Sequence, residues 1–294
     1  MYKLLFLDMD GTLLSNNKTI SSENKHAIKA AQNKGVKIVL CTGRPLEGIT
    51  SYLNQLNLMN INDYSITSSG GMIMNNACGN IISRCFFNAE ALKYLCSMAQ
   101  FLNLDLSFYS NGKISVYRHN LYSYLDSAVN SSQYEVQKLE DIFKNKEISK
   151  VNLINEHKGV LKDYAELFGL DTSSYNSFAF RENPNVNIFS DISNLPSYLL
   201  ENFSVLKLSN CSYEVLNKGT NKGTSVKTLS NHLNISLNEV ICIGDSGNDE
   251  HMIHCAGLGV AMGNAQDKIK AVANYVTLSN EENGVAHVIE KFIL

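Results

Sequence analysis

Short unbroken apolar runs alternate with stretches of helical spacing near the start of the chain. The runs at residues 4–7 and 36–41 have the length and continuity of strands that are buried on both faces of a parallel sheet. Between them, residues 21–33 place alanine and isoleucine on one side of a helix, with serines at its start and Gly35 beyond its end. This β-α-β order predicts a right-handed crossover and a parallel sheet.

The same alternation returns after residue 224. The pattern predicts helices at 225–233, 250–255 and 284–292, and strands at 240–243, 258–261 and 275–277. We therefore expect the two ends of the chain to build one α/β layer together.

The middle of the chain has a different pattern. Residues 106–117 alternate apolar and polar positions around an Asn-Gly pair, which predicts an antiparallel hairpin with one exposed face. Further short strands are predicted at 151–154, 177–180, 186–189 and 205–208, and helices at 89–102, 157–168 and 193–202. The expected fold class is α/β, a Rossmann-like parallel-sheet core of residues 1–83 and 211–294, with residues 84–210 inserted as an α+β domain.

Composition narrows the class of protein. The 294 residues carry a net charge of -3, with 44% apolar and 18% charged residues, which is typical of a globular chain and not of a nucleic-acid or polybasic membrane binder. Seven scattered cysteines without a CxxC pair indicate reduced thiols. No stretch approaches 18 apolar residues, and the run before Asp8 is too short for a signal peptide. We expect a soluble, cytoplasmic protein, a monomer or weak homodimer, without nucleic-acid or membrane partners.

Two carboxylates follow the first predicted strand. Asp8 and Asp10 lie two residues apart, so their Cα atoms are only ~6.6 Å apart and their side chains point to the same side. At 4 Å and an effective dielectric of 20 their repulsion would be about 4 kcal/mol, which a hard cation such as Mg²⁺ would relieve. Gly11 allows a sharp turn and close approach of a ligand. The alternative is a solvated acidic turn, but the preceding buried strand and the Gly-Thr pair favour a cation site.

Two other predicted strands end in polar residues. Residues 42–44 (Thr-Gly-Arg) offer a hydroxyl and an unobstructed N–H that could bind an anion, although the same residues also suit an ordinary turn. Residues 244–249 (Gly-Asp-Ser-Gly-Asn-Asp) place another carboxylate at a strand end, where Asp245 or Ser246 could equally cap a helix. Because the ends of parallel strands lie side by side, we expect these groups to meet the Asp8 turn.

A lysine begins the helix before the 240–243 strand. Lys222 at this position opposes the helix macrodipole and needs an anionic partner, although it could also be an exposed surface lysine. Lys218 is a rival for the same role, and we favour Lys222.

Four motifs now stand in order along the chain: DMDGT at 8–12, CTGR at 41–44, NKGTS at 221–225 and GDSGND at 244–249. In this order they resemble the haloacid dehalogenase (HAD) superfamily of phosphotransferases, and most closely its Cof-type branch, whose large α/β cap lies between the second and third motifs. The segments 261–265 and 283–286 also resemble that branch. One departure is residues 68–71, Ser-Ser-Gly-Gly, where the family usually has Asn-Gly.

The resemblance implies roles for nine residues. Asp8 would be the nucleophile and Asp10 the general acid and base, with a pKa that we expect the crowded carboxylates to raise. Mg²⁺ would be held by Asp8, the Asp10 backbone carbonyl and Asp245, with Asp249 supporting it. The phosphate would be bound by the Met9 backbone, Thr42, Gly43, Lys222 and Asn248.

We therefore expect a Mg²⁺-dependent phosphatase that hydrolyses small phosphorylated metabolites, such as sugar phosphates, through an aspartyl-phosphate. The inserted domain would exclude water and select the leaving group. Two alternatives stay open, a phosphomutase or phosphotransferase with the same intermediate, and a catalytically silent metabolite-binding protein.

Three other features are set aside. The glycines of residues 257–263 resemble a dinucleotide fingerprint, but the strand and helix around them come in the reverse order. His251 and His254 are three residues apart on a helix, a spacing that could suit a metal, but without a third ligand they are more typical of surface residues. Residues 117–120 (Tyr-Arg-His-Asn) suit either a substrate-facing loop or plain surface.

Overall fold

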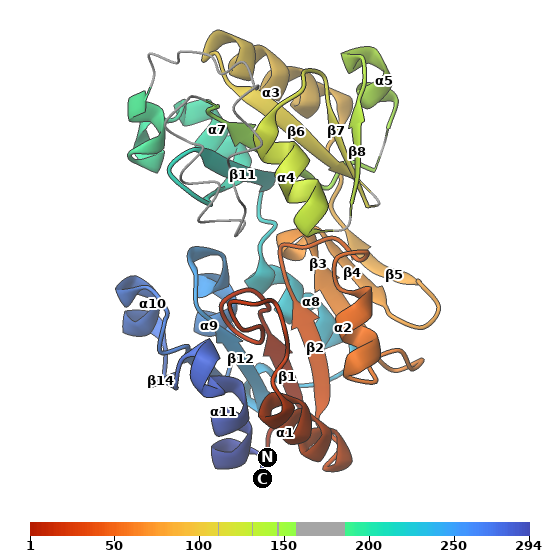
Figure 1. Cartoon of the computed structure of the whole chain (residues 1–294), viewed down its shortest axis with the longest axis vertical. Helices are drawn as coiled ribbons and strands as arrows, with labels where there is room; N and C mark the ends of the chain where they lie inside the picture. Colours follow the sequence, from red (N-terminus) through yellow and green to blue (C-terminus); the bar gives the residue numbers. More distant parts are fainter. Residues whose placement is uncertain (111, 131, 146, 157–185) are drawn as a thin grey trace. The chain divides into compact units, whose positions relative to one another are not determined.

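The computed structural model describes residues 1–110, 112–130, 132–145, 147–156 and 186–294. The chain forms two compact units (Figure 1). The first unit comprises Met1–Arg44, Ile49–Arg84 and Thr220–Leu294, and the second comprises Pro45–Gly48 and Cys85–Gly219. The helix expected at 157–168 and the strand expected at 177–180 lie outside the described residues.

The first unit is built on an eight-stranded sheet in the order β14-β13-β12-β1-β2-β3-β4-β5. Its parallel strands are β1 (Leu4–Leu7), β2 (Lys37–Cys41), β3 (Tyr64–Thr67), β12 (Val240–Gly244), β13 (Leu258–Ala261) and β14 (Tyr275–Val276). Strand β4 (Met72–Asn75) and the edge strand β5 (Ile81–Arg84) are antiparallel and were not predicted. The α/β fold class is confirmed, because both ends of the chain contribute strands to one mainly parallel sheet.

Helices cover this sheet. They are α1 (Ser22–Asn33), α2 (Thr50–Gln55), α8 (Lys222–His232), α9 (Glu250–Cys255), α10 (Asp267–Val272) and α11 (Gly284–Phe292). Ser21 caps α1 as predicted, because its side chain accepts a hydrogen bond from the Asn24 N–H. Leu4 and Phe6 of β1 pack in one buried cluster with residues of α8 and α9. Helices α1 and α11 lie side by side (Figure 1), joined where the Ala286 N–H donates to the Asn24 side chain.

The second unit has a six-stranded sheet in the order β10-β11-β9-β6-β7-β8. Its strands are β6 (Asp105–Ser110), β7 (Lys113–Val116), β8 (Gln133–Val136), β9 (Lys150–Ile154), β10 (Phe203–Lys207) and β11 (Ser212–Asn217), and its helices α3 (Ala89–Phe101), α4 (Leu121–Val129), α5 (Leu139–Lys144) and α7 (Ser197–Asn202). We expected the first domain to resume at residue 211. Strand β11 instead pairs with β9 and β10, so the second sheet extends to residue 217.

Three local expectations for the second unit differ from the structure. Residues 186–189 form a 3₁₀ turn instead of a strand, and the carbonyl of Ile188 accepts a hydrogen bond from the Tyr213 hydroxyl. The helix expected at 193–202 is interrupted, because Pro196 ends one short turn and precedes α7. Strand β6 was expected to expose one face, but all its residues are buried, because Leu106 and Phe108 pack in the hydrophobic core and Ser107 and Tyr109 on the other face are covered as well.

Within the described ranges, no helix is long and apolar enough to cross a membrane.

A partly buried carboxyl group lies at the start of α4. Glu156 accepts hydrogen bonds from the backbone N–H groups of Leu121, at 2.5 Å, and Tyr122, at 3.2 Å. Burial raises the pKa of Glu156 to about 7, with a contribution from the nearby charge of Asp105, even though these two hydrogen bonds oppose the rise. At pH 6 the folded protein therefore keeps a proton that the unfolded chain releases.

We predict that this proton makes stability depend on pH. Between pH ~4.5 and ~7 the free energy of unfolding should fall by up to about 3 kcal/mol as pH rises, because ionisation is penalised only in the folded state. Glu156→Gln, which carries no charge, should reduce the decline between pH 5 and pH 8 by that amount in urea titrations, and the raised pKa values of Asp8 and Asp245 account for the decline that remains. Glu140→Gln on the surface of α5 is the matched control, and an unchanged pH slope in Glu156→Gln would contradict the assignment.

Candidate active site

Three neighbouring strands of the first sheet end in the polar residues singled out above. Strand β1 lies between β12 and β2, so Asp8, Thr42 and Asp245 follow adjacent strands. The Asp8 N–H donates to the Ile243 carbonyl at 3.0 Å, and the Thr42 N–H donates to the Ile66 carbonyl at 2.9 Å. The backbone therefore stays bonded to the sheet up to these positions, which fixes where their side chains begin.

Lys222 occupies the centre of this arrangement and is completely buried. Its Nζ donates to Asp8 Oδ1 at 2.5 Å and to Asp249 Oδ1 at 2.7 Å. Burial alone would lower the pKa of the ammonium group, but the carboxylates of Asp249 and Asp8 raise it well above its ordinary value. Lys222 is thus a permanent cation, and the expectation that it needs an anionic partner matches its contacts. Lys218 lies elsewhere, where its Nζ donates to the Leu200 carbonyl.

Asp8, Asp245 and Asp249 each place a carboxylate oxygen within 4.8 Å of the other two. Burial, with the charge of Asp249 next, raises the pKa of Asp245 to about 6 and that of Asp8 well above its ordinary value. When all three carboxylates are ionised, the single ammonium group of Lys222 leaves a net charge of about −2. One divalent cation would balance this charge. Oxygen ligands at this spacing fit a hard ion such as Mg²⁺, because the ion would remove the repulsion that raises these pKa values.

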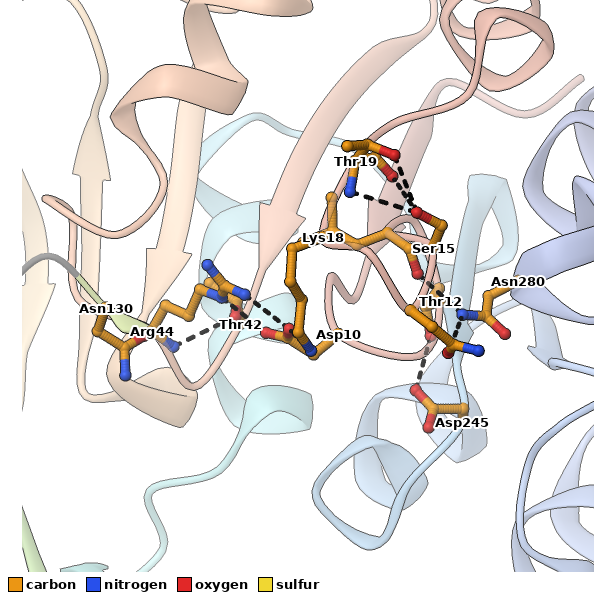
Figure 2. Close-up of polar contacts among 12 residues, drawn as sticks. Asp10, Thr12, Ser15, Lys18, Thr19, Thr42, Arg44, Asn130, Asp245 and Asn280 are labelled. Carbon is orange, nitrogen blue, oxygen red and sulfur yellow. Dashed lines mark hydrogen bonds and ion pairs between the residues drawn. The ribbon is translucent and has the colours of Figure 1, made fainter. Parts of the chain in front are cut away.

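Asp10 faces a different set of partners (Figure 2). Its two carboxylate oxygens accept hydrogen bonds from Arg44 Nε and Nη2, each at 2.6 Å, and Lys18 Nζ lies 2.8 Å from Oδ1. Burial pushes the pKa of Asp10 upward, but hydrogen bonds and charge from Arg44, assisted by Lys18, outweigh it and lower the pKa to about 2. The expected rise in this pKa is therefore wrong, because two cations, and not the other carboxylates, surround the group.

Side-chain hydrogen bonds with three other segments stabilise the turn after β1. Thr12 Oγ1 donates to Asp245 Oδ1 at 2.9 Å (Figure 2), which ties the first motif to the fourth. Gly11 has φ +83°, and a Cβ there would lie 2.5 Å from Asp245 Oδ2, so glycine is required for both conformation and space. The Asn264 side chain donates to the Gly11 carbonyl at 2.8 Å, and the Asn280 side chain donates to the Leu14 carbonyl at 2.9 Å.

The residues expected to bind phosphate lie around the same turn. Met9 and Thr42 are buried, and Thr42 Oγ1 accepts the Arg44 N–H at 3.2 Å. Asn248 Oδ1 accepts a hydrogen bond from the Ser246 hydroxyl at 2.7 Å. A Cβ on Gly43 would lie 3.2 Å from Ser69 Oγ, so the smallest residue keeps this position open.

The 68–71 segment, where the chain departs from the family pattern, reaches this site through its backbone. The Ser69 N–H donates to the Thr42 carbonyl at 2.9 Å, and the Ser68 N–H donates to the Arg44 carbonyl at 3.0 Å. Both serines have left-handed backbones, with φ values of 50° and 55°, which is unusual outside glycine. Ser69 Oγ is buried and has no hydrogen-bond partner among the described residues, so it is free to bind a polar group.

Sequence reasoning missed several residues of this site. Arg44 and Thr12 lie inside quoted motifs but had no assigned contact, and Asn264 lies in the 261–265 segment. Lys18 stands in a polar loop after the first motif, and nothing in its spacing points to Asp10. The Asp10 carboxylate turns to Arg44, so it does not share a cation site with the Asp8 carboxylate as the spacing of the two residues indicated. The Asp10 backbone carbonyl, which the resemblance implies as a metal ligand, stays a prediction.

Fold and site together place the chain among hydrolases built on a mainly parallel α/β core. A family model described as haloacid dehalogenase-like hydrolase matches residues 5–289, and the chain belongs to this family. The Bacillus subtilis (strain 168) protein named "Putative phosphatase YxeH" is 32% identical over 296 residues, covering 100% of this chain and 99% of that protein. The phosphatase YcsE of the same organism, named for 5-amino-6-(5-phospho-D-ribitylamino)uracil, is 29% identical and covers 99% of this chain and 96% of its own.

A solved structure supports the same grouping. A haloacid dehalogenase-like hydrolase from Bacteroides thetaiotaomicron is 27% identical, covers both chains completely and superposes with a TM-score of 0.76. The resemblance inferred from the four motifs is confirmed, as is the expectation of a hydrolase with phosphatase relatives.

Removing the central cation should destabilise the protein. We predict that Lys222→Met lowers the free energy of unfolding by about 3–5 kcal/mol, because it leaves buried carboxylates without their counter-ion. Urea or thermal unfolding at pH 8 measures the loss. Lys218→Met removes an exposed lysine from the rival position and should leave stability nearly unchanged, and equal losses in the two variants would refute the central role of Lys222.

Proposed function

We propose that the protein is a Mg²⁺-dependent phosphatase that hydrolyses phosphate monoesters of small metabolites through an aspartyl-phosphate on Asp8. The proposal rests above all on the group formed by the buried residues Asp8, Lys222 and Asp249 with the partly buried Asp245. A phosphate monoester is nearly a dianion and repels an aspartate nucleophile. Stabilisation by nearby positive charge is therefore the main requirement for this reaction.

In the first step an Asp8 carboxylate oxygen attacks phosphorus while the bond from phosphorus to the leaving oxygen breaks. Mg²⁺, held by Asp8, Asp245 and Asp249, would neutralise charge on the transferred group. Lys222 supports the same charge through its contact with Asp8. The Met9 backbone, Thr42, Gly43 and Asn248 would bind the phosphate oxygens, and Ser69 Oγ is a further donor for that group.

Asp10 would give a proton to the leaving alcohol and later take one from the attacking water, which releases phosphate and restores Asp8. With Arg44 and Lys18 bound to it, Asp10 is an ionised carboxylate that can accept a proton but cannot donate one. The first step therefore requires a rearrangement in which these two cations leave Asp10, and substrate oxygens are natural alternative partners for them.

The substrate is proposed to be a small phosphorylated metabolite with a polar body. Relatives named for phosphorylated ribitylaminouracil support this size and chemistry. We further propose that the first unit carries the chemistry and that the inserted second unit selects the substrate. The positions of the four motifs support this division, because all of them lie outside residues 85–219.

We predict that the wild-type protein hydrolyses para-nitrophenyl phosphate with Mg²⁺ and that Asp8→Asn loses at least about 10³-fold in kcat, because the nucleophile is gone. Asp267→Asn, an exposed carboxylate at the start of α10, is the matched control. Full activity in Asp8→Asn would sink the proposal. If a hexose monophosphate yields its positional isomer instead of free phosphate, the protein is a mutase.

A second prediction concerns the metal. Chelation with EDTA should abolish hydrolysis, and Mg²⁺ should restore it. Asp245→Asn should raise the Mg²⁺ concentration for half-maximal activity by about tenfold or more, because one of three charged ligands becomes neutral. Asp267→Asn should keep the wild-type requirement, and hydrolysis that continues unchanged in EDTA would contradict the metal assignment.

A further inference from the structure

The second unit contains a cavity of about 620 Å³ that the site described above does not use. It lies between α3 and α5, beside the segment that follows β7, and residues of these three elements line it. Lys93 and Gln100 come from α3, Tyr117 and Arg118 follow β7, and Phe143 comes from α5. Its volume is in the range of small-molecule sites.

The charge of this cavity has one sign. Lys93 and Arg118 line it, and none of the described lining residues is acidic, although the whole chain is net negative. Arg118 is fixed from behind by Asp105, a buried residue outside the lining, whose Oδ1 accepts from Arg118 Nε at 2.6 Å. Lys93 has no ion pair with another described residue. Among the described residues, the cavity therefore presents a positioned guanidinium group and, on its exposed side, a lysine ammonium group without an ion pair.

One part of the cavity wall is aromatic and aliphatic, and the rest is polar. Tyr117, Phe143 and Leu139 are partly buried and pack against the hydrophobic core of the second unit, so their orientation is supported from behind. The Arg118 guanidinium carbon lies 5.6 Å from the centre of the Tyr117 ring. Flat apolar walls of this kind suit a planar ring, and Gln100 adds a neutral hydrogen-bonding group.

We propose that this cavity is a second ligand site, for a small molecule that joins a planar ring to an anionic group. The ring would lie against Tyr117 and Phe143, and a carboxylate, sulfonate or phosphate would face Lys93 and Arg118. Planar donors on Arg118 match such oxyanions, and Lys93 supplies the net charge that favours them. The proposal does not depend on the reaction at Asp8.

The test uses two dyes of similar shape and the full-length protein. Anilinonaphthalene sulfonate has the ring and the anion but no phosphate ester, and N-phenyl-1-naphthylamine has the ring without the charge. Fluorescence titration, checked by calorimetry, should show one saturable site for the sulfonate. Lys93→Glu should weaken sulfonate binding at least tenfold and change binding of the neutral dye less than twofold.

Lys207→Glu makes the same charge change on the exposed edge strand β10 and should leave both affinities at the wild-type value. Phe143→Ala should weaken both dyes, with circular dichroism confirming the fold. Equal sulfonate affinity in Lys93→Glu and Lys207→Glu, or the absence of saturable binding, would overturn the proposal.

Two further measurements separate this site from the reaction centre. Sulfonate binding should persist in Asp8→Asn and in excess inorganic phosphate, and displacement by phosphate would assign the dye to the reaction centre instead. Hydrolysis of para-nitrophenyl phosphate by Lys93→Glu should equal the wild-type rate. If the sulfonate does not bind while hydrolysis is normal, only the cavity proposal is contradicted. If hydrolysis is absent while the sulfonate binds, only the proposed reaction is contradicted.

Discussion

The contact of one buried ammonium group with two buried carboxylates determines how the first unit is organised. Lys222 joins Asp8, which follows β1, to Asp249, which follows β12, at distances of 2.5 and 2.7 Å. An ion pair removed from water in this way costs free energy unless every charge is matched, so neither carboxylate can be changed independently. The remaining negative charge would be balanced by a divalent cation beside Asp245. In the proposed reaction, stability and reactivity therefore depend on the same few atoms.

A second group of charges balances Asp10 separately. Arg44 and Lys18 hold this carboxylate ionised, while the Lys222 group contains an excess of negative charge. The two groups are only two residues apart at Asp8 and Asp10, yet their pKa values shift in opposite directions. The contrast runs opposite to the proposed roles, because a nucleophile must be ionised and a general acid must be protonated. The proposed reaction therefore requires a cation beside Asp8 and the release of Asp10 from Arg44 and Lys18.

Most of the strands of the first unit could be predicted from the pattern of apolar and polar residues in the sequence. Continuous apolar runs identified β1, β2 and β12, and the rule that parallel strands end at one edge brought Asp8, Thr42 and Asp245 together. What could not be predicted depends on side-chain direction. The sequence does not say that the Asp10 carboxylate turns to Arg44, and that contact reversed the expected pKa shift. The second unit was harder, because short strands such as β11 lack a motif and Pro196 was read as part of a helix.

The hydrogen bonds from two asparagines to the turn after β1 also determine how late in synthesis this turn can be completed. Asn264 and Asn280 hold the carbonyls of Gly11 and Leu14, across separations of 253 and 266 residues. The ribosome must release almost the whole polypeptide before either bond can form. An unfinished chain therefore carries its DMDGT segment unbraced, and a protein truncated before residue 264 would lack these supports even with all four motifs present.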